Sequence, residues 1–207
     1  RTEQGGFAEK FKAVLRLDPD VIMVGEIRDQ DTAKTALQSS LTGHLVLSTY
    51  HASSAAAALT RLLDSIGDNP LFSSAIRLVA AQRLIRRLDN DTKQPYSPDD
   101  ATRRWLQKVI DSLPPHLERP SLDDVQLYKP GSSAENPFGY KGQIAVRELL
   151  LMTNNIQIEL KKHTSEITTS GIENIAVQDG MITMLQDAVL QALAGETSVE
   201  EVARVVA

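Results

Sequence analysis

Two short apolar runs, each followed by polar residues, are the strongest pattern in the chain. Residues 21–24 read Val-Ile-Met-Val, with Pro19 before them and Gly25 after them. Residues 44–49 read His-Leu-Val-Leu-Ser-Thr. Short apolar runs rich in branched residues are typical of parallel strands that are buried on both faces. We therefore predict two buried strands, with the carboxylate of Glu26 at the carboxyl end of the first.

The segment between these runs has helical spacing. Residues 32–41 carry their apolar side chains on one face, with Asp29 or Asp31 available as the N-cap and Gly43 as the stop. A strand, a helix and a strand within about 30 residues form a right-handed βαβ crossover with a parallel sheet. Ligands bind such open sheets at the carboxyl ends of the strands. An α/β fold with a site near Glu26 follows.

The rest of the pattern is mostly helical. Apolar spacing predicts further helices at 7–17, 54–66, 69–87, 100–113, 155–162, 166–178, 183–194 and 199–206. A capping box, Thr197 to Glu200, begins the last of them. The turn-rich segment 89–98 reads as a linker or domain edge, 129–142 as a loop, and 143–152 as a strand. The second half of the chain is therefore expected to be rich in helix.

Composition limits the classes of function. The chain has 207 residues with a net charge of −5, so a general surface for nucleic acid or anionic membrane is not favoured. No run approaches the roughly 18 apolar residues that a membrane span requires, and no signal peptide opens the chain. The absence of cysteine excludes disulfides and thiolate zinc sites. A cytoplasmic location is the simplest expectation.

Two sequence boxes resemble those of a known family. VIMVGEIRD, at 21–29, and TGHLVLSTYHA, at 42–52, resemble the Walker B and histidine boxes of the secretion ATPases, which power type II secretion and type IV pilus assembly. The boxes occur in the same order, with one helix-length spacer. The resemblance covers nearly the whole chain and implies the C-terminal half of such an ATPase. It implies a partial RecA-like P-loop NTPase core at 1–88, a linker helix with a loop and strand at 89–152, and an α-rich helical subdomain at 153–207.

The resemblance assigns catalytic roles to two residues. Glu26 is expected to orient and polarise the water that attacks the terminal phosphate, a role that suits a carboxylate held on a strand end. His51 is expected to sense the γ-phosphate. Neighbouring parallel strands lie about 5 Å apart, so these two side chains can face one crevice. Gly25 stands where many P-loop proteins carry an Asp that contacts magnesium, and the same glycine is usual in the secretion ATPases.

Other residues of the boxes have two open interpretations. Arg16 matches a position near the nucleotide, although an arginine on a helix surface is the alternative. Thr49 could bond phosphate or water, or could serve only in packing. Arg28, also near the nucleotide, is expected to pair with Asp29 and hold the loop after the first strand. His44 lies before its strand and is expected to be structural.

The resemblance implies an ATPase that uses Mg²⁺ and ATP in its full-length form. It implies a cytoplasmic homo-hexamer, peripheral to the inner membrane, that acts on a membrane platform protein, while the net charge of −5 leads us to expect no nucleic-acid partner. No GxxxxGK[ST] motif occurs in the sequence, so we expect this chain to be a fragment that is inactive by itself. One alternative is a non-catalytic interaction or oligomerisation module. The other is a DNA-uptake or conjugation motor of the same superfamily.

One region departs from the family pattern. Assembly ATPases of this group commonly carry two C-x-x-C pairs that bind zinc. The approximate counterparts here are Asp89 and Thr92, followed by Ser132 and Glu135. These four side chains make a poor zinc site, so we expect no zinc and no other bound metal beyond the magnesium of the nucleotide. If the loop is ordered, apolar packing is expected to replace the metal.

Overall fold

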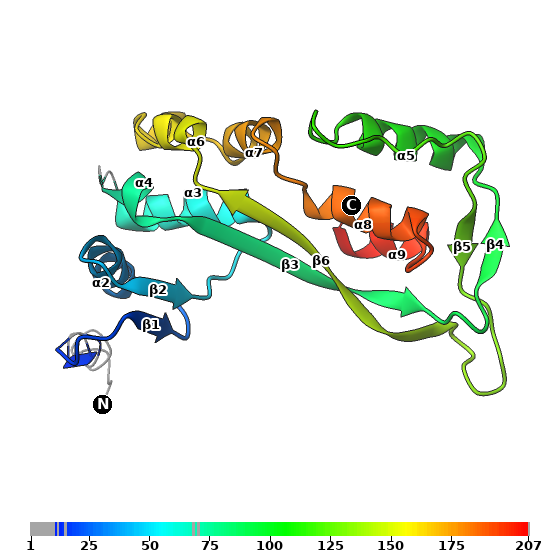
Figure 1. Cartoon of the computed structure of the whole chain (residues 1–207), viewed down its shortest axis with the longest axis horizontal. Coiled ribbons are helices and arrows are strands. Elements are labelled where there is room, and N and C mark those ends of the chain that lie inside the picture. Colours follow the sequence, from blue (N-terminus) through cyan, green and yellow to red (C-terminus); the bar gives the residue numbers. More distant parts are fainter. Residues whose placement is uncertain (1–10, 12, 15, 68, 70, 207) are drawn as a thin grey trace. The chain divides into compact units, whose positions relative to one another are not determined.

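The computed structural model describes residues 11, 13, 14, 16–67, 69 and 71–206 (Figure 1). Described residues within 1–79 and 150–176 form one compact unit, here called unit 1, and those within 80–149 and 177–207 form unit 2. The expected helix at 7–17 lies mostly outside the described residues. The expected domain boundaries at 88 and 152 stay predictions.

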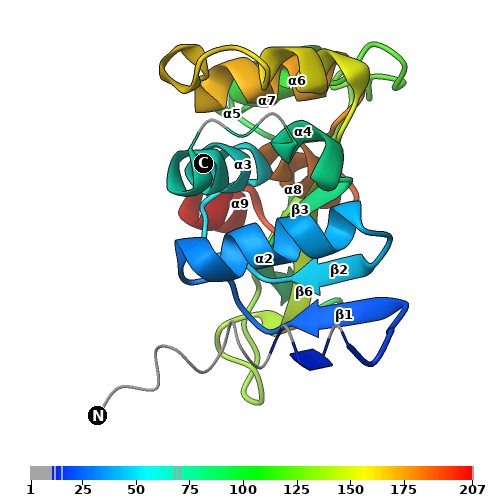
Figure 2. The ribbon, with the colours of Figure 1, turned by 90° about the vertical axis from the view of Figure 1, so that its left-hand side faces the viewer.

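Unit 1 contains the predicted βαβ crossover. Strand β1 (Val21–Val24) pairs in parallel with β2 (Leu45–Ser48), and α2 (Gln30–Leu41) connects them. Figure 2 shows α2 running along one side of the two strands. Asp29 caps α2, because its Oδ1 accepts a hydrogen bond of 2.8 Å from the backbone N–H of Thr32. The predicted α/β fold with a parallel sheet is confirmed.

The prediction that both strands are buried on both faces is wrong. Ile22 and Val24 are buried and pack against Phe11 and Ala36. The opposite face is exposed, and its side chains, Val21, Met23, Leu45 and Leu47, have relative exposures between 49% and 79%. The register pairs Val21 with Leu45 and Met23 with Leu47, so these apolar side chains share one surface. An apolar run shows that a strand has apolar side chains on both faces. It does not show which part of a protein packs against the second face.

The helices α3 (Ala55–Ile66), α4 (Phe72–Ala75), α6 (Asn154–Glu159) and the 3-10 helix η1 (Thr164–Glu166) complete unit 1, together with most of α7 (Thr169–Gln178). Ser54 caps α3 by accepting a 3.0 Å hydrogen bond from the backbone of Ala57, and Gly67 ends the helix with a φ of 77°. Thr60 in α3 and Thr169 in α7 place their hydroxyl oxygens 3.0 Å apart. The helices expected at 54–66, 155–162 and 166–178 are therefore present with modified bounds.

The helix predicted at 69–87 is wrong. The chain forms only the short α4 there and then enters a long strand, β3 (Leu78–Leu88), which pairs with β6 (Tyr140–Leu151). The apolar residues of this segment fit a helical face, but a mixed apolar pattern of this length also fits a strand. The pairing with a segment more than 50 residues away decides between them. The strand expected at 143–152 is present and begins three residues earlier than expected.

Unit 2 packs helices against strands around one apolar core. Strand β4 (Gln94–Tyr96), in the segment expected to be a linker, pairs antiparallel with β5 (Leu127–Lys129), for which no strand was predicted. The expected helices are present as α5 (Asp100–Asp111), α8 (Met184–Leu193) and α9 (Val199–Val206). The core includes Ile85, Leu106, Ile110, Val146, Ala188 and Val202.

The N-terminus of α9 differs from the expected capping box. Ser198, not Thr197, accepts the hydrogen bond from the backbone of Glu201, at 3.2 Å. Thr197 instead donates its hydroxyl proton to the backbone oxygen of Arg86, at 2.9 Å. A capping box is formed at α8, between Thr183 and Gln186. Neighbouring hydroxyl residues compete for the cap position, and the contact with β3 decides which of them is used.

The carboxylate of Glu201 is fully buried between β3 and α9. It accepts hydrogen bonds from the backbone and guanidinium of Arg86 and from the guanidinium of Arg204, at 2.6 to 2.9 Å. Arg86 also lies 4.1 Å from the ring centroid of Tyr140. Burial by itself would raise the pKa of Glu201, but the hydrogen bonds from Arg204 and Arg86 outweigh it and lower the pKa to about 2.

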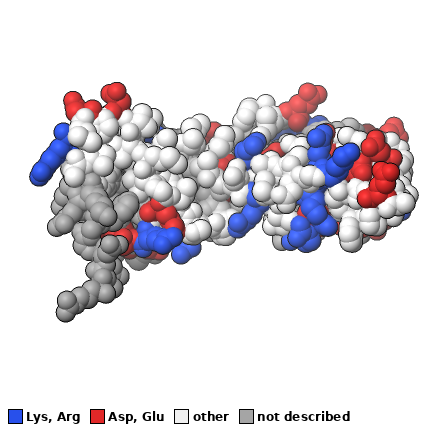
Figure 3. All heavy atoms as spheres, turned by 90° about the horizontal axis from the view of Figure 1, so that it is seen from below, with Lys and Arg blue, Asp and Glu red and all other residues white. Residues whose placement is uncertain are grey.

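The space-filling view shows the charge on one face of the molecule. In Figure 3, groups of lysine and arginine side chains lie beside acidic groups and do not form one continuous basic field on that face. Continuous basic surfaces are the usual feature of proteins that bind nucleic-acid phosphates. Among the described residues, no helix has both the length and the apolar character required to cross a membrane.

We expect the substitution Glu201→Ala to lower the free energy of unfolding by about 3 kcal/mol, because it leaves Arg86 and Arg204 without their shared buried partner. The folded-state pKa of about 2 lies below the ordinary value of 4.5. The stabilisation is therefore complete above the ordinary value and is lost as the pH falls towards the folded value. Urea unfolding of both proteins at neutral and acidic pH measures this difference.

The matched control is Glu196→Ala. Glu196 pairs with Arg87 at 2.7 Å on a partly exposed surface, so its loss is expected to cost less than about 1 kcal/mol. Equal destabilisation by the two substitutions, or an effect of Glu201→Ala that does not shrink at acidic pH, contradicts the assignment.

Candidate functional site

Two loops at the carboxyl edge of the parallel strands build the site. The loop after β1 carries Glu26, and the loop after β2 carries His51. The backbone N–H of Ile27 donates to the backbone oxygen of Thr49 at 3.1 Å, and the Thr49 hydroxyl donates to the backbone oxygen of Gly25 at 2.6 Å. These cross-links hold the two loops side by side beyond the ends of the strands.

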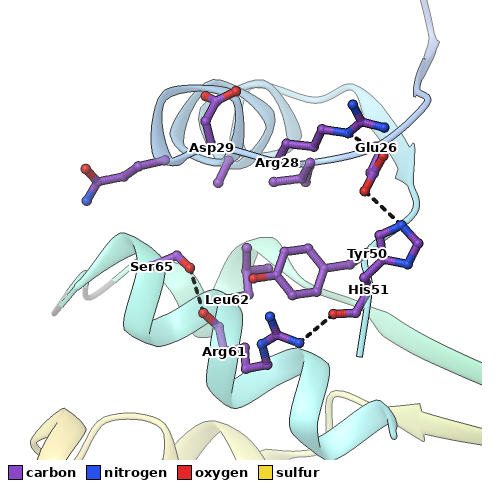
Figure 4. Close-up of a pocket in the computed structure, with 11 residues that line it drawn as sticks. Glu26, Arg28, Asp29, Tyr50, His51, Arg61, Leu62 and Ser65 are labelled. Carbon is purple, nitrogen blue, oxygen red and sulfur yellow. Dashed lines mark hydrogen bonds and ion pairs between the residues drawn. The ribbon is translucent and has the colours of Figure 1, made fainter. Parts of the chain in front are cut away.

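Glu26 is the centre of a small charged cluster (Figure 4). Its Oε1 lies 3.0 Å from Nε2 of His51, and its Oε2 lies 2.6 Å from Nε of Arg28. The side chain of Glu26 is 20% exposed, whereas those of Arg28 and His51 are 79% and 91% exposed. The structure thus brings Glu26 and His51 into contact, with the carboxylate anchored and its two partners open to solvent. Their catalytic roles stay predictions.

The expected ion pair between Arg28 and Asp29 is wrong. The carboxylate of Asp29 is committed to the start of α2, where its oxygens accept hydrogen bonds from the backbone and hydroxyl of Thr32 at 2.8 and 2.9 Å. Arg28 turns to Glu26 instead. The N-cap contact of Asp29 with α2 therefore leaves Glu26 as the partner of Arg28.

The remaining box residues lie at different distances from this cluster. Thr49 and Gly25 belong to the cross-link between the loops, so the hydroxyl of Thr49 is engaged by the backbone. His44 lies beyond the end of α2, with its Nδ1 3.1 Å from the backbone oxygen of Ser39, and its structural role stays a prediction. Arg16 is exposed in the turn before β1 and does not line the cavity next to Glu26.

A cavity of about 250 Å³ opens beside the cluster, between the two loops and α3. Sequence reasoning missed part of its lining, namely Tyr50, Arg61, Leu62 and Ser65. Arg61 reaches from α3 to donate a hydrogen bond of 2.9 Å to the backbone oxygen of His51, and its guanidinium lies 5.9 Å from the ring centroid of Tyr50. The available signal was the position of an arginine on the helix that follows the His51 loop.

The cavity is lined by the carboxylates of Glu26 and Asp29, two guanidinium groups and an imidazole, and Glu26 is the carboxylate in contact with His51 and Arg28. Guanidinium groups bind phosphate and carboxylate oxygens strongly, and a carboxylate among them can accept a proton from water. The arrangement therefore suits an anionic ligand that reacts with water. Among the described residues, no group of three or more histidine and acidic side chains is placed to hold a metal ion by itself.

Comparison with known families identifies the chain. The family model described as type II/IV secretion system protein matches residues 2–204. The chain belongs to this family. Among curated members, it is 40% identical over 201 residues to type II secretion system protein E of Xanthomonas campestris, covering 96% of this chain and 33% of that protein. It is 41% identical over 199 residues to the type IV pilus assembly ATPase PilB of Thermus thermophilus, covering 95% and 21%.

Solved structures share the fold of this type II/IV secretion protein. The alignment with the ATPase DotB of Legionella pneumophila covers 97% of this chain and 42% of the DotB chain, with a TM-score of 0.63 and 22% identity. The alignment with the pilus retraction motor PilT covers 97% of this chain and 43% of the PilT chain, with a TM-score of 0.62 and 22% identity. The chain spans about a third of the Xanthomonas relative and about a fifth of PilB. Activities of the whole relatives are therefore proposals for this chain.

We expect Arg61→Ala to loosen the loop that carries His51, because the substitution removes the hydrogen bond to the His51 carbonyl. Amide hydrogen exchange in the peptide 49–54 should become several-fold faster, with a loss of about 1 kcal/mol or less in global stability. Arg61→Lys, which keeps the charge and one donor, is the matched control and should retain part of the protection. Unchanged exchange in Arg61→Ala contradicts a positioning role for this arginine.

Proposed function

We propose that this chain is part of an ATP-hydrolysing motor of type II secretion or type IV pilus assembly. The observation that carries the proposal is the contact of 3.0 Å between Glu26 and His51 at the carboxyl edge of two parallel strands. Curated relatives near 40% identity, which are named for these two systems, support the same conclusion.

Glu26 is the proposed base. Each of its carboxylate oxygens has one side-chain partner in this structure and keeps further acceptor capacity for a water molecule. The side chain of Glu26 is only 20% exposed, while those of His51 and Arg28 are largely exposed and can turn towards a terminal phosphate. In this arrangement Glu26 orients and polarises the attacking water, and His51 reports the presence of the phosphate to the loop that carries Glu26.

The residues present suit the phosphate end of magnesium-bound ATP. Mg²⁺ in such sites takes one or two carboxylates together with phosphate oxygens and water, and Glu26 lies where it can supply one. Arg28 and Arg61, which line the cavity, provide guanidinium groups for a polyphosphate. The sequence has no GxxxxGK[ST] loop, so the backbone amides and lysine that bind the inner phosphates would come from outside these 207 residues. ATP supplies the phosphoryl group whose transfer to water drives the motor.

The proposed assembly is a homo-hexamer on the cytoplasmic side of the inner membrane, next to a membrane platform protein. In that assembly Arg16 and Arg28 could contact nucleotide near a subunit boundary. The exposed apolar face of β1 and β2 supports the proposal that the two strands belong to a larger core in the assembly. Four large apolar side chains are unfavourable when exposed to water. The DNA-uptake or conjugation motor stays an alternative within the same superfamily.

A second candidate is a non-catalytic interaction or oligomerisation module. The same exposed apolar face favours it, since a parallel sheet with one open face can bind another polypeptide without any nucleotide. The two candidates differ in one respect that can be measured. The motor requires Glu26 for hydrolysis, whereas the module requires only the apolar face.

The test uses a longer protein that contains these 207 residues together with a nucleotide-binding loop. Glu26→Gln is expected to lower the rate of ATP hydrolysis at least about 100-fold while leaving the affinity for magnesium-ATP within about threefold, because the amide keeps the shape but cannot act as a base. Calorimetry and steady-state phosphate release measure the two quantities separately.

The matched control is Glu196→Gln, which makes the same chemical change in unit 2, at a residue that does not line the cavity, and should leave both quantities unchanged. Hydrolysis at the unmodified rate in Glu26→Gln contradicts the proposed base. Tight binding of magnesium-ATP by the 207-residue chain alone contradicts the statement that its nucleotide site is incomplete. Loss of self-association in Met23→Asp, with no hydrolysis in any longer protein, would favour the interaction module.

A further inference from the structure

The turn at 89–93 and the loop at 130–139 lie against each other in unit 2. Resemblance to the assembly ATPases places zinc-binding cysteine pairs in these two segments. In the structure, the contact between the two segments is made by Asp89 in the turn and Asn136 in the loop. Asn136 lies one position beyond Glu135, which was the expected counterpart of a cysteine. The amide Nδ2 of Asn136 donates to Oδ2 of Asp89 at 2.8 Å. Polar contacts therefore join the segments, so the expectation that apolar packing would do so is wrong.

Asp89 organises its own turn as well as this contact. Its Oδ1 accepts from the backbone N–H of Asp91 at 3.1 Å, and its backbone oxygen accepts from Thr92 and Lys93 at 3.1 and 2.8 Å. The hydrogen bond from Asn136, followed by that from Asp91, lowers the pKa of Asp89 below its ordinary value. The carboxylate is thus ionised, and a strong acceptor, at neutral pH.

Asn136 also makes several hydrogen bonds besides the one to Asp89. Its Nδ2 also donates to the backbone oxygen of Tyr140 at 3.1 Å, and its Oδ1 accepts from the backbone of Gly139 at 3.2 Å. Its backbone N–H donates to the hydroxyl of Ser133 at 3.0 Å, while its backbone oxygen accepts from Ser133 at 3.1 Å. The amide therefore uses both of its donors and its acceptor within the loop and the turn.

Two glycines allow the close approach of the segments. A Cβ atom added at Gly131 would lie 1.8 Å from the backbone oxygen of Thr92. A Cβ atom added at Gly139, where φ is +68°, would lie 2.1 Å from the backbone oxygen of Gly131. The backbone of Asp89 also donates directly to the backbone oxygen of Gly139 at 3.0 Å. The two segments thus meet at backbone contact distance.

We propose that Asp89 and Asn136 form a metal-independent clasp that closes the 89–93 turn on the 130–139 loop, in place of the zinc site of related ATPases. The clasp fixes the ends of β3 and β6 next to the start of α9. There, Leu88 donates to the backbone oxygen of Glu196 at 2.9 Å, and the hydroxyls of Tyr140 and Ser198 lie 2.9 Å apart. Its function is to order this end of unit 2 without a metal or a thiol.

The donor set at this position does not fit zinc. The hydroxyl of Thr92, at an expected ligand position, is buried and has no hydrogen-bond partner among the described residues. Glu135 and Ser132, at two further expected positions, are exposed. The carboxylate of Asp89 is already bound by Asn136 and by the turn. Two carboxylates and two hydroxyls, of which Glu135 and Ser132 are exposed, do not make the tetrahedral sulfur and nitrogen site that structural zinc requires.

The test measures local opening of the two segments in the purified 207-residue chain. Asp89→Ala and Asn136→Ala should each speed amide hydrogen exchange in the peptides 89–93 and 130–139 about tenfold or more, and the double substitution should be little faster than either single one. Glu135→Ala, next to Asn136 but exposed, is the matched control and should leave exchange unchanged. Thr92→Val should raise the melting temperature by about 2–4 °C, because it removes a buried unpaired hydroxyl.

Metal analysis of the same sample provides an independent measurement. The proposal expects no stoichiometric zinc, and expects EDTA and thiol oxidants to leave exchange and melting unchanged. One equivalent of bound zinc, with a lower melting temperature in EDTA, would overturn it. Exchange in Asp89→Ala and Asn136→Ala equal to that of Glu135→Ala, or independent effects of the two substitutions, would overturn it as well.

Discussion

The parallel pairing of β1 with β2 is the constraint on which the site depends. The register sets Val24 opposite Ser48, so that both strands end at the same edge and their loops begin side by side. The contacts of Thr49 with Ile27 and Gly25 then continue the pairing into the loops. A slip of one residue would exchange the faces of the slipped strand and separate Glu26 from its partner loop. The contact between Glu26 and His51 therefore depends on the hydrogen bonds that pair the two strands and their loops.

The central features of unit 1 could be predicted because they are local. The apolar run before Gly25 and the polar capping residues before α2 and α3 each indicate an element from adjacent residues, although the choice of Asp29 over Asp31 as the cap of α2 came only from the structure. Parallel strands joined by one helix must end at one edge, so the meeting of Glu26 with His51 followed from the order of elements. Predictions of this kind need no knowledge of distant parts of the chain.

The errors have a different origin, since each depends on a tertiary contact or on competition between hydrogen-bond partners. β3 was expected to be a helix because its pairing with β6 cannot be read from its own spacing. Arg61 was missed because a helix-surface arginine shows no sign of the carbonyl that it will contact. The wrong partner was predicted for Arg28 because the carboxylate of Asp29 caps α2 and does not pair with Arg28. In each case a tertiary contact or a competing hydrogen bond decided between two locally acceptable arrangements.

Three carboxylates of the chain show how the same group becomes structural or available for chemistry. Glu201 is fully buried and receives several hydrogen bonds from two arginines, so its oxygens are saturated and its pKa is low. Asp89 is bound by its own turn and by Asn136 in the same way. Glu26 is 20% exposed, and its partners are exposed side chains that can exchange one contact for another. A base needs an anchored position together with spare acceptor capacity, and among these three carboxylates Glu26 combines them.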